Sequence, residues 1–282
     1  MIKPKTKVLL YSRRQDAPSS ERHMQYLLEG FKAGKVGSES TSSAVACVLW
    51  SKYPIAFEQV ADQMPMPWYL LYTITGLGSI HEPNVPPVDD QIDLFIRLSQ
   101  KYGSNRLVWR FDPVIIDDKL TIKERIAMFK YIRKRLDGFT DRCIFSFIDC
   151  KYLKGKPSQN NGYRYRAIKP RDIYDFLYEM IDAADGLPLY SCVSNVPAEF
   201  KGQINHNQCI DIDRINAICG TSIPYERDKG QRPDCQCHKS KDLGSYKNGC
   251  KFGCGYCYGC YFRDMDAHKK AARVGNLKKL ES

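Results

Sequence analysis

The run Ala44-Val45-Ala46-Cys47-Val48-Leu49-Trp50, at residues 44–50, decides the fold class of this chain. Every residue in it is apolar, so it lacks the alternation that marks a strand with one face in water. A continuous apolar run of this length is typical of a parallel strand that is buried on both faces. The run therefore predicts a parallel sheet.

Similar apolar runs recur along the chain, and stretches with helical periodicity separate them. Strands are expected at residues 8–12, 68–75, 107–113, 143–149 and 187–192, and helices at about 20–33, 89–102, 122–136 and 170–184. Strands that alternate with helices predict an α/β fold of parallel βα units, assembled as a partial or closed (β/α) barrel. We assign residues 1–200 to this barrel and residues 201–282 to a cysteine-rich segment that completes it and ends in a basic tail.

Polar and charged residues gather where the predicted strands end. In a barrel of βα units the carboxyl ends of the strands line the functional mouth, so these side chains are candidates for a polar pocket. Ion pairs across the mouth are the alternative explanation. The positions are Ser12, Arg13, Arg14, Asp16, Ser51, Lys52, Thr73, Thr75, Arg110, Asp112, Asp149 and Cys192.

The composition limits the classes of protein that fit. The 282 residues carry a formal net charge of +11, which favours an anionic partner such as nucleic acid. No apolar run approaches the roughly 20 residues that cross a bilayer, and the first residues lack the apolar core of a signal peptide, so we expect a cytoplasmic protein without a membrane partner. Cytoplasmic cysteines rarely form disulfides, and metal binding better explains why so many of the twelve crowd the last third of the chain.

Three of these cysteines, Cys250, Cys254 and Cys257, stand close together with glycines between them. Thiolates at this spacing can converge on one soft metal centre. If they hold a four-iron cubane, one iron is left without a protein ligand, and that iron is an open position for chemistry. A zinc ion completed by Cys260 or by a distant cysteine is the alternative.

This Cys-x3-Cys-x2-Cys spacing resembles the signature of radical S-adenosylmethionine enzymes, and residues 249–258 resemble the spore photoproduct lyase-like members, which act on DNA. The resemblance implies a 4Fe-4S cluster whose open iron binds S-adenosylmethionine, and a reductant such as flavodoxin or ferredoxin. Enzymes of this type usually carry the motif after the first barrel strand, whereas here it follows the sixth predicted strand. A circularly permuted barrel resolves the difference if residues just before Cys250 form a strand beside residues 8–12.

The resemblance also gives the residues at the strand ends candidate roles. Arginine can grip a carboxylate or phosphate through two hydrogen bonds, and aspartate can hold ribose hydroxyls or an amino group. We expect cofactor-binding residues among Ser12, Arg13, Arg14, Lys52, Thr75 and Tyr256, and catalytic residues among Arg110, Asp112 and Asp149.

Nearly the whole chain also resembles an uncharacterised bacterial family, a domain of unknown function. The shared stretches are Tyr-Ser-Arg-Arg-Gln-Asp-Ala-Pro at 11–18, Trp-Ser-Lys-Tyr-Pro at 50–54, Trp-Arg-Phe-Asp-Pro at 109–113, Ser-Phe-Ile-Asp at 146–149 and much of the run from Cys235 to Tyr258. This second resemblance implies no assayed activity.

Four further thiols, Cys192, Cys209, Cys235 and Cys237, form a candidate second set. Four thiolates would satisfy either an auxiliary iron–sulfur cluster or a structural zinc ion. The Cys-x-Cys spacing at 235–237 is less usual for zinc than Cys-x2-Cys, which favours iron–sulfur.

Residues 151–171 combine basic and aromatic side chains and contain no acidic residue. A loop that binds single-stranded nucleic acid combines basic side chains, which contact phosphates, with aromatic rings, which stack on exposed bases. A solvated basic loop is the alternative. The candidate residues for binding DNA or RNA are Lys151, Lys154, Lys156, Tyr163, Arg164, Tyr165 and Arg166.

Together these patterns predict a radical S-adenosylmethionine enzyme that acts on nucleic acid or a nucleotide, with a catalytic and an auxiliary cluster. The alternative function is a non-enzymatic protein that binds nucleic acid and is stabilised by zinc or an iron–sulfur cluster.

Overall fold

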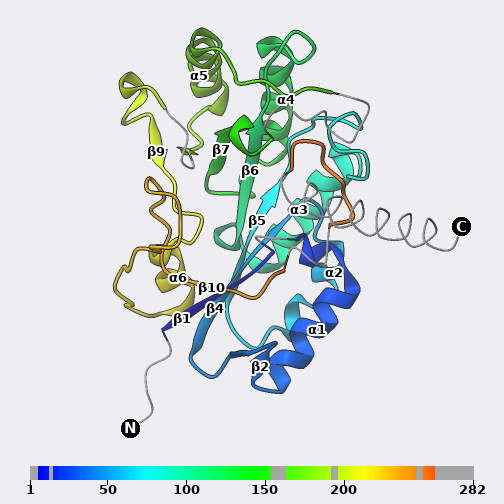
Figure 1. Cartoon of the computed structure of the whole chain (residues 1–282), viewed down its shortest axis with the longest axis vertical. Helices are drawn as coiled ribbons and strands as arrows, with labels where there is room; N and C mark the ends of the chain where they lie inside the picture. Colours follow the sequence, from blue (N-terminus) through cyan, green and yellow to red (C-terminus); the bar gives the residue numbers. More distant parts are fainter. Residues whose placement is uncertain (1–5, 13–14, 154–162, 192–195, 246–249, 258–282) are drawn as a thin grey trace, which may run out of the picture.

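A computed structural model describes residues 6–12, 15–153, 163–191, 196–245 and 250–257 of the chain, and for Tyr152 it describes the backbone only. Within these ranges the chain forms one large parallel sheet, helices and a short β-hairpin (Figure 1). In the same ranges no helix is both long enough and apolar enough to cross a membrane.

The sheet contains eight strands in the order β10-β1-β4-β5-β6-β7-β8-β9, and every neighbouring pair is parallel. All six strands predicted from the apolar runs are confirmed, whereas the short β9 and α6 were not predicted. The strands are β1 (Lys7–Tyr11), β4 (Ala44–Ser51), β5 (Trp68–Thr73), β6 (Leu107–Val114), β7 (Cys143–Phe147), β8 (Leu189–Ser191), β9 (Ile204–His206) and β10 (Lys241–Asp242).

The four predicted helices are also confirmed, and further short elements accompany them. The helices are α1 (Glu21–Lys32), α2 (Ile55–Glu58), α3 (Val88–Tyr102), α4 (Ile122–Arg135), α5 (Pro170–Ala184) and α6 (Ile212–Cys219), and the hairpin is β2 (Lys35–Val36) with β3 (Glu39–Ser40). Single 3-10 turns lie at η1 (Ala17–Ser19), η2 (Ala61–Gln63), η3 (Ser104–Arg106), η4 (Cys150–Tyr152) and η5 (Ala198–Phe200).

The order of the strands confirms the prediction that a strand shortly before Cys250 lies beside β1. Leu9 pairs with Lys241 and Leu10 pairs with Asp242, so β10 joins the sheet next to β1 although it is the last of the described strands. Among the described strands, β10 and β9 form the two edges and do not pair with each other. The sheet is therefore an open parallel α/β sheet, and closure into a barrel stays a prediction.

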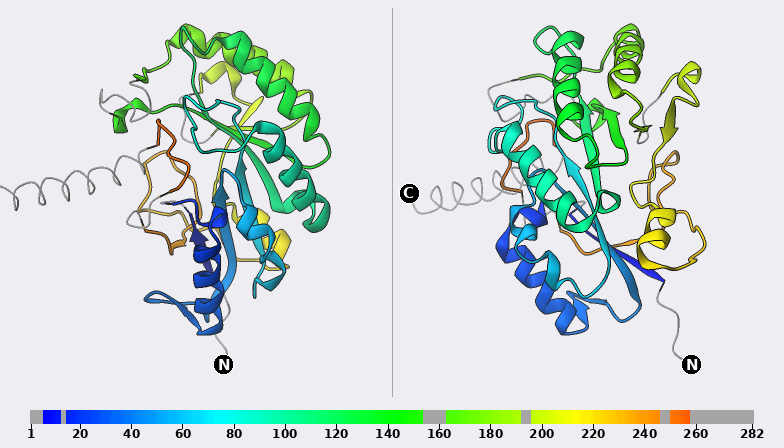
Figure 2. Two further views of the ribbon diagram at one scale, coloured as in Figure 1. Left: turned by 90° about the vertical axis from the view of Figure 1, so that its right-hand side faces the viewer. Right: turned by 180° about the vertical axis from the view of Figure 1, so that it is seen from behind.

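Alternate residues of each strand face two separate apolar layers, as the pleat of a β-strand requires. One layer contains Leu9, Leu49 and Leu70 together with the buried faces of α1, α3, α4 and α5. The other contains Leu10, Val48 and Leu71, packed against residues from the 209–237 segment. In the left view of Figure 2 the helices α3, α4 and α5 curve along one side of the sheet, while the orange-red chain lies on the other.

Arg125, which is 2% exposed, fastens α4 to the loop that follows β5. The helix begins with a capping box, in which Thr121 and Glu124 bond to each other's backbone N–H groups. One turn later the Nη2 atom of Arg125 donates to the carbonyl of Thr75 at 2.6 Å, and its guanidinium lies 4.6 Å from the centre of the Phe111 ring. The buried arginine thus fixes the backbone of Thr75, a strand-end residue.

Arg125→Ala is expected to lower the free energy of unfolding by about 2 to 4 kcal/mol, because it leaves a cavity and a buried carbonyl without its donor. Urea denaturation followed by circular dichroism measures the change. Arg97→Ala is the matched control: Arg97 forms an ion pair with Glu58 on the surface, so its loss should cost less than about 1 kcal/mol. Equal effects of the two substitutions would contradict the role of Arg125.

Candidate active site at the carboxyl ends of the strands

One face of the sheet carries Leu10, Val48 and Leu71, and we call it the inner face. This face changes from apolar to polar as the strands reach their carboxyl ends. In β5 the buried Tyr69 and Leu71 are followed on the same face by Thr73, and in β6 Val108 is followed by Arg110 and Asp112. The alternation of the strands therefore delivers these polar side chains to one place, as the sequence predicted for a functional mouth.

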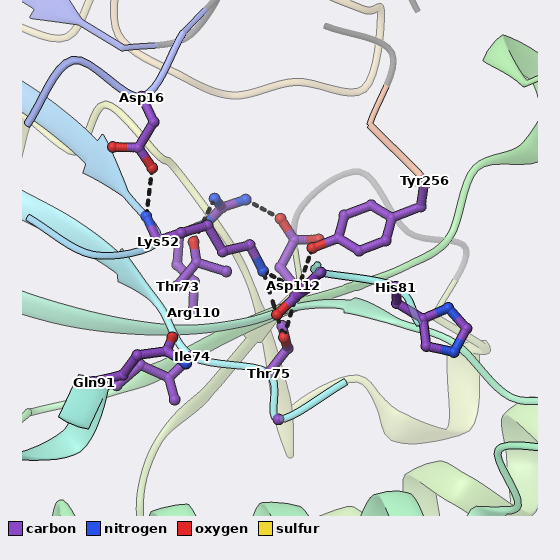
Figure 3. A network of polar contacts seen from close by, with 12 residues as sticks. Asp16, Lys52, Thr73, Ile74, Thr75, His81, Gln91, Arg110, Asp112 and Tyr256 are labelled. Carbon is purple, nitrogen blue, oxygen red and sulfur yellow. Dashed lines mark hydrogen bonds and ion pairs between the residues drawn. The ribbon is translucent and has the colours of Figure 1, made fainter. Parts of the chain in front are cut away.

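Arg110 and Asp112 form an ion pair there, and each side chain is 16% exposed. The Nη1 atom of Arg110 also donates to Thr73 Oγ1 at 3.2 Å, and the hydroxyl of Ser146, at the end of β7, donates to Asp112. Figure 3 shows the pair at the centre of the polar contacts. The predicted residues Arg110 and Asp112 of β6 are thus brought together with side chains from the two neighbouring strands, β5 and β7.

A second, more deeply buried group surrounds Glu82, which is 4% exposed and lies in the loop after β5. One oxygen of its carboxylate accepts hydrogen bonds from Lys52 Nζ, Tyr256 OH and Thr75 Oγ1, the last at 2.8 Å. Burial opposes ionisation of Glu82, but the charge of Lys52 and the hydrogen bonds hold its pKa below the ordinary value. The carboxylate is therefore ionised at neutral pH and is the common partner of three predicted cofactor-binding residues.

Sequence reasoning missed Glu82 and its neighbour His81. The available signal was a His-Glu pair directly after the glycine-rich exit of β5 and before a proline-rich stretch, at residues 81–82. Nothing in that local pattern shows that the loop folds back onto Lys52.

Asp16 joins the exits of β1 and β4. Its carboxylate accepts hydrogen bonds from Ser51 Oγ and from the backbone N–H of Lys52, both at 2.6 Å. Burial raises the pKa of Asp16 to about 6, although these hydrogen bonds and the nearby charge of Lys251 favour the ionised form. Asp16 thereby sets the direction in which Lys52 leaves the strand.

The loop that carries Cys250, Cys254 and Cys257 is fastened over this polar layer by several contacts. The backbone N–H of Gly255 donates to the carbonyl of His81 at 2.9 Å, and Lys251 Nζ donates to the carbonyl of Ser19 at 2.6 Å. Gly253 has a φ of +62°, a conformation that favours glycine, and it allows the turn between the first two cysteines. Tyr256 points from this loop toward Lys52, whose Nζ lies 5.4 Å from the ring centre (Figure 3).

The three thiols of this loop are partly or fully buried and lie near one another. Burial raises the pKa of Cys250 to about 12 and that of Cys254 well above its ordinary value, and each of these thiols lies close enough to Cys257 to feel its charge. Within the described ranges, no three His, Cys, Asp or Glu side chains converge as ligands of one ion. Three thiolates are the donor set of a 4Fe-4S cluster that keeps one iron without a protein ligand. The donor set is therefore compatible with a 4Fe-4S cluster.

Aromatic residues close one side of the site. Tyr165 shares a hydrogen bond of 3.0 Å with Nδ1 of the buried His81, and its ring lies edge-on to that of Tyr256 with 6.2 Å between centres. Tyr163 lies next to them, with its ring centre 4.6 Å from that of His81. Arg164 and Arg166 alternate with these tyrosines and are exposed. The segment thus turns its tyrosines toward the site and its arginines toward solvent.

Other predicted residues lie elsewhere or outside the described ranges. Asp149 caps η4 by accepting from the backbone N–H of Lys151, which is exposed, and its carboxylate pairs with Arg232 at 3.5 Å. Ser12 is buried at the end of β1 with a φ of +127°. Arg13, Arg14, Lys154, Lys156 and Cys192 are outside the residues that the structure describes.

The second cysteine set is partly brought together. Cys209, Cys235 and Cys237 are all buried in the apolar layer on the inner face of the sheet. The side chain of Cys237 is hydrogen-bonded to those of both Cys209 and Cys235. Three members of the predicted four-thiol set therefore lie in contact.

These features define the class: an α/β protein with a parallel sheet, whose polar strand ends lie under a loop with three cysteines. The chain belongs to the DUF1848 family, a domain of unknown function, which it matches over residues 12–259. The prediction of a family of unknown function is confirmed, and the likeness to radical S-adenosylmethionine enzymes stays a prediction. No curated protein and no solved structure matches the chain.

Proposed function

We propose that this chain is a radical S-adenosylmethionine enzyme in which Cys250, Cys254 and Cys257 hold a 4Fe-4S cluster. The observation that carries the proposal is the position of the cysteine loop, which is tied to the exits of β1 and β5 and contacts the polar network of Lys52, Thr75 and Glu82 through Tyr256. When bound, such a cluster supplies the electron that cleaves a carbon–sulfur bond of S-adenosylmethionine and so yields a 5′-deoxyadenosyl radical.

The residues of the chain would bind and orient the cofactor beside the loop. Arg110 and Asp112 present opposite charges at the mouth, which suits a molecule with both a carboxylate and an amino group. Glu82 and Lys52 would hold Tyr256, and hence Cys254 and Cys257 on either side of it, in a fixed position. The aromatic group of His81, Tyr163 and Tyr165 would keep water away from the reacting atoms.

An assay of cofactor cleavage tests this proposal. The protein is purified without oxygen, reconstituted with iron and sulfide, reduced, and supplied with S-adenosylmethionine, and the formation of 5′-deoxyadenosine is measured. The proposal predicts at least one equivalent of 5′-deoxyadenosine per chain, and several equivalents if the enzyme turns over repeatedly. A reconstituted protein that holds its cluster and forms no 5′-deoxyadenosine would overturn it, as would a colourless protein with zinc at the motif.

The substrate that we propose is a single-stranded nucleic acid. The exposed Arg164 and Arg166 lie beside the aromatic group at the site, so phosphates along the segment would bring a base toward Tyr163 and Tyr165. The net charge of +11 supports an anionic substrate.

Replacing both Arg164 and Arg166 by alanine is expected to weaken binding of single-stranded oligonucleotides and to reduce the slope of log K against log salt by about 1.4, since each contact contributes about 0.7. Fluorescence anisotropy over a range of salt concentrations measures the slope. Replacing Arg97 and Lys101 removes the same charge from α3 and should leave the slope nearly unchanged. An unaltered slope in the Arg164/Arg166 variant would remove this segment from the interface.

A further inference from the structure

We infer that Arg232 is a further phosphate contact for a single-stranded nucleic acid, on the other side of the exit of β7 from Arg164 and Arg166. This role rests on the substrate proposed above and deepens it, because contacts on both sides give the strand a path across the site. Such binding requires neither a metal nor cleavage of S-adenosylmethionine.

A short turn at the exit of β7 separates the two groups of cations. Ile148 belongs to a small apolar cluster, and Cys150 and Tyr165 pack against it. Asp149 lies between Ile148 and Cys150 with an extended backbone (φ −100°, ψ 95°), so its side chain points away from theirs. Its carboxylate pairs there with Arg232 Nη1 at 3.5 Å. Arg232 and the tyrosine segment therefore lie on opposite sides of this turn.

Arg232 is carried by an ordered loop at residues 227–235. The Nε atom of Arg227 donates to the carbonyl of Cys235 at 3.0 Å, and its Nη2 atom donates to the carbonyl of Pro233. The carbonyl of Arg232 accepts from the backbone N–H of Cys235 at 2.9 Å. The backbone under Arg232 is therefore fixed, which limits the conformational entropy that is lost when this side chain binds a ligand.

The exposed tip of this loop is basic. Asp228 is turned inward, where its carboxylate accepts a hydrogen bond from Nε2 of Gln231 at 3.2 Å. Lys229 and Arg232 are exposed together with one acidic residue, Asp234. Two exposed cations against one exposed anion give the tip a positive charge, which favours a phosphate.

The ion pair with Asp149 restrains Arg232 and leaves it accessible. The side chain of Arg232 is 51% exposed, and that of Asp149 is 35% exposed. A guanidinium has several N–H donors in a planar fork, whose geometry matches that of a phosphate group. An ion pair with this exposure adds little to stability, so replacing Arg232 should leave the fold intact.

Exposed cations on both sides of the turn define the path of the strand. Arg164 and Arg166 are exposed on either side of Tyr165, and Lys151, directly after the turn, is exposed as well. Phosphates bound by Arg232 and by the two arginines would draw the nucleotides between them over Tyr165, whose ring can stack on a base. The phosphate contacts would thus position a base at the site.

The test measures how the full chain binds a fluorescent oligothymidylate of about 16 nucleotides, by anisotropy over a range of salt concentrations and without S-adenosylmethionine. Arg232→Ala should reduce the slope of log K against log salt by about 0.7, because one phosphate contact is lost. Arg97→Ala is the matched control and should leave the slope unchanged. Arg97 is 52% exposed and is likewise paired with a carboxylate, that of Glu58, but it lies on α3.

Two further variants sharpen the result. Arg232→Lys keeps the positive charge and should keep the slope, whereas replacing Arg164, Arg166 and Arg232 together by alanine should reduce the slope by about 2.1, since three contacts add. If Arg232→Ala binds with the slope of the wild type while the Arg164/Arg166 variant loses slope, the role of Arg232 is wrong and the proposed substrate stands. A chain that binds no oligothymidylate would overturn both. The radical reaction is judged separately, from 5′-deoxyadenosine, so its failure is distinguishable from either result.

Discussion

Cys254→Ala is expected to abolish cleavage of S-adenosylmethionine and to reduce the iron content by about one cluster per chain. Cys254 is the most buried of the three motif thiols, at 6% exposure, and it lies between Cys250 and Cys257 on a loop with little freedom to supply a substitute. Removing a residue that only supports a ligand already costs 10- to 100-fold, so loss of a ligand should lower 5′-deoxyadenosine formation by more than about 100-fold.

The matched control is Cys219→Ala, because Cys219 is half-buried on α6 and belongs to neither proposed set. It should keep both the cluster and the activity. Retained cleavage in the Cys254→Ala protein would remove the motif from the mechanism, whatever the metal content.

Glu82→Ala is expected to destabilise the fold by about 3 to 5 kcal/mol, the typical cost of removing one partner from a buried ion pair. The Lys52 and Glu82 side chains are only 13% and 3% exposed, so the substitution would leave an uncompensated ammonium group and an unpaired tyrosine hydroxyl. Urea denaturation measures the loss. Glu58→Ala, which breaks the surface pair with Arg97, is the control and should cost less than about 1 kcal/mol.

The pH dependence of the Glu82 effect has a definite sign. The folded state holds the pKa of Glu82 below its ordinary value of 4.5, so the carboxylate contributes stability above that pH and loses it as the pH falls through the lower, folded value. The difference in unfolding free energy between the wild type and Glu82→Gln should therefore narrow below about pH 4.5. A difference that stays constant or widens in acid would show that the ion pair does not stabilise the fold.

Glu82 also connects stability with the proposed activity. Its bond to Tyr256 is one of the contacts that hold the cysteine loop. Glu82→Gln should therefore lower cluster occupancy more than Leu98→Ala, a core substitution near the end of α3, when the two proteins are compared at the same stability. If the Glu82→Gln protein and the control variant hold equal amounts of cluster at equal stability, Glu82 has only a structural role.

The sequence predicted the strands and helices that have strong local signals. Residues 44–50 are apolar throughout, and Thr121 with Glu124 form a capping box, so β4 and the start of α4 follow from neighbouring residues alone. The strand β10 has two polar residues and no such signal. Its position beside β1 was predicted only from where the cysteine motif stands in the chain.

The site was predicted in part for a similar reason. Alternation along a strand places Thr73, Arg110 and Asp112 on the inner face, so their proximity follows from the sequence. The return of Glu82 onto Lys52 and the pairing of Asp149 with Arg232 depend on how loops fold in three dimensions. No local pattern contains that information.

Electron paramagnetic resonance of the reduced protein, recorded with and without S-adenosylmethionine, tests the central claim most directly. If three thiols leave one iron without a protein ligand, the spectrum should show a reduced cluster whose signal changes when the cofactor is added. The variant with Cys250, Cys254 and Cys257 replaced by serine should lose that responsive signal and about four irons. A spectrum that ignores the cofactor, or a motif that holds only zinc, would contradict the account.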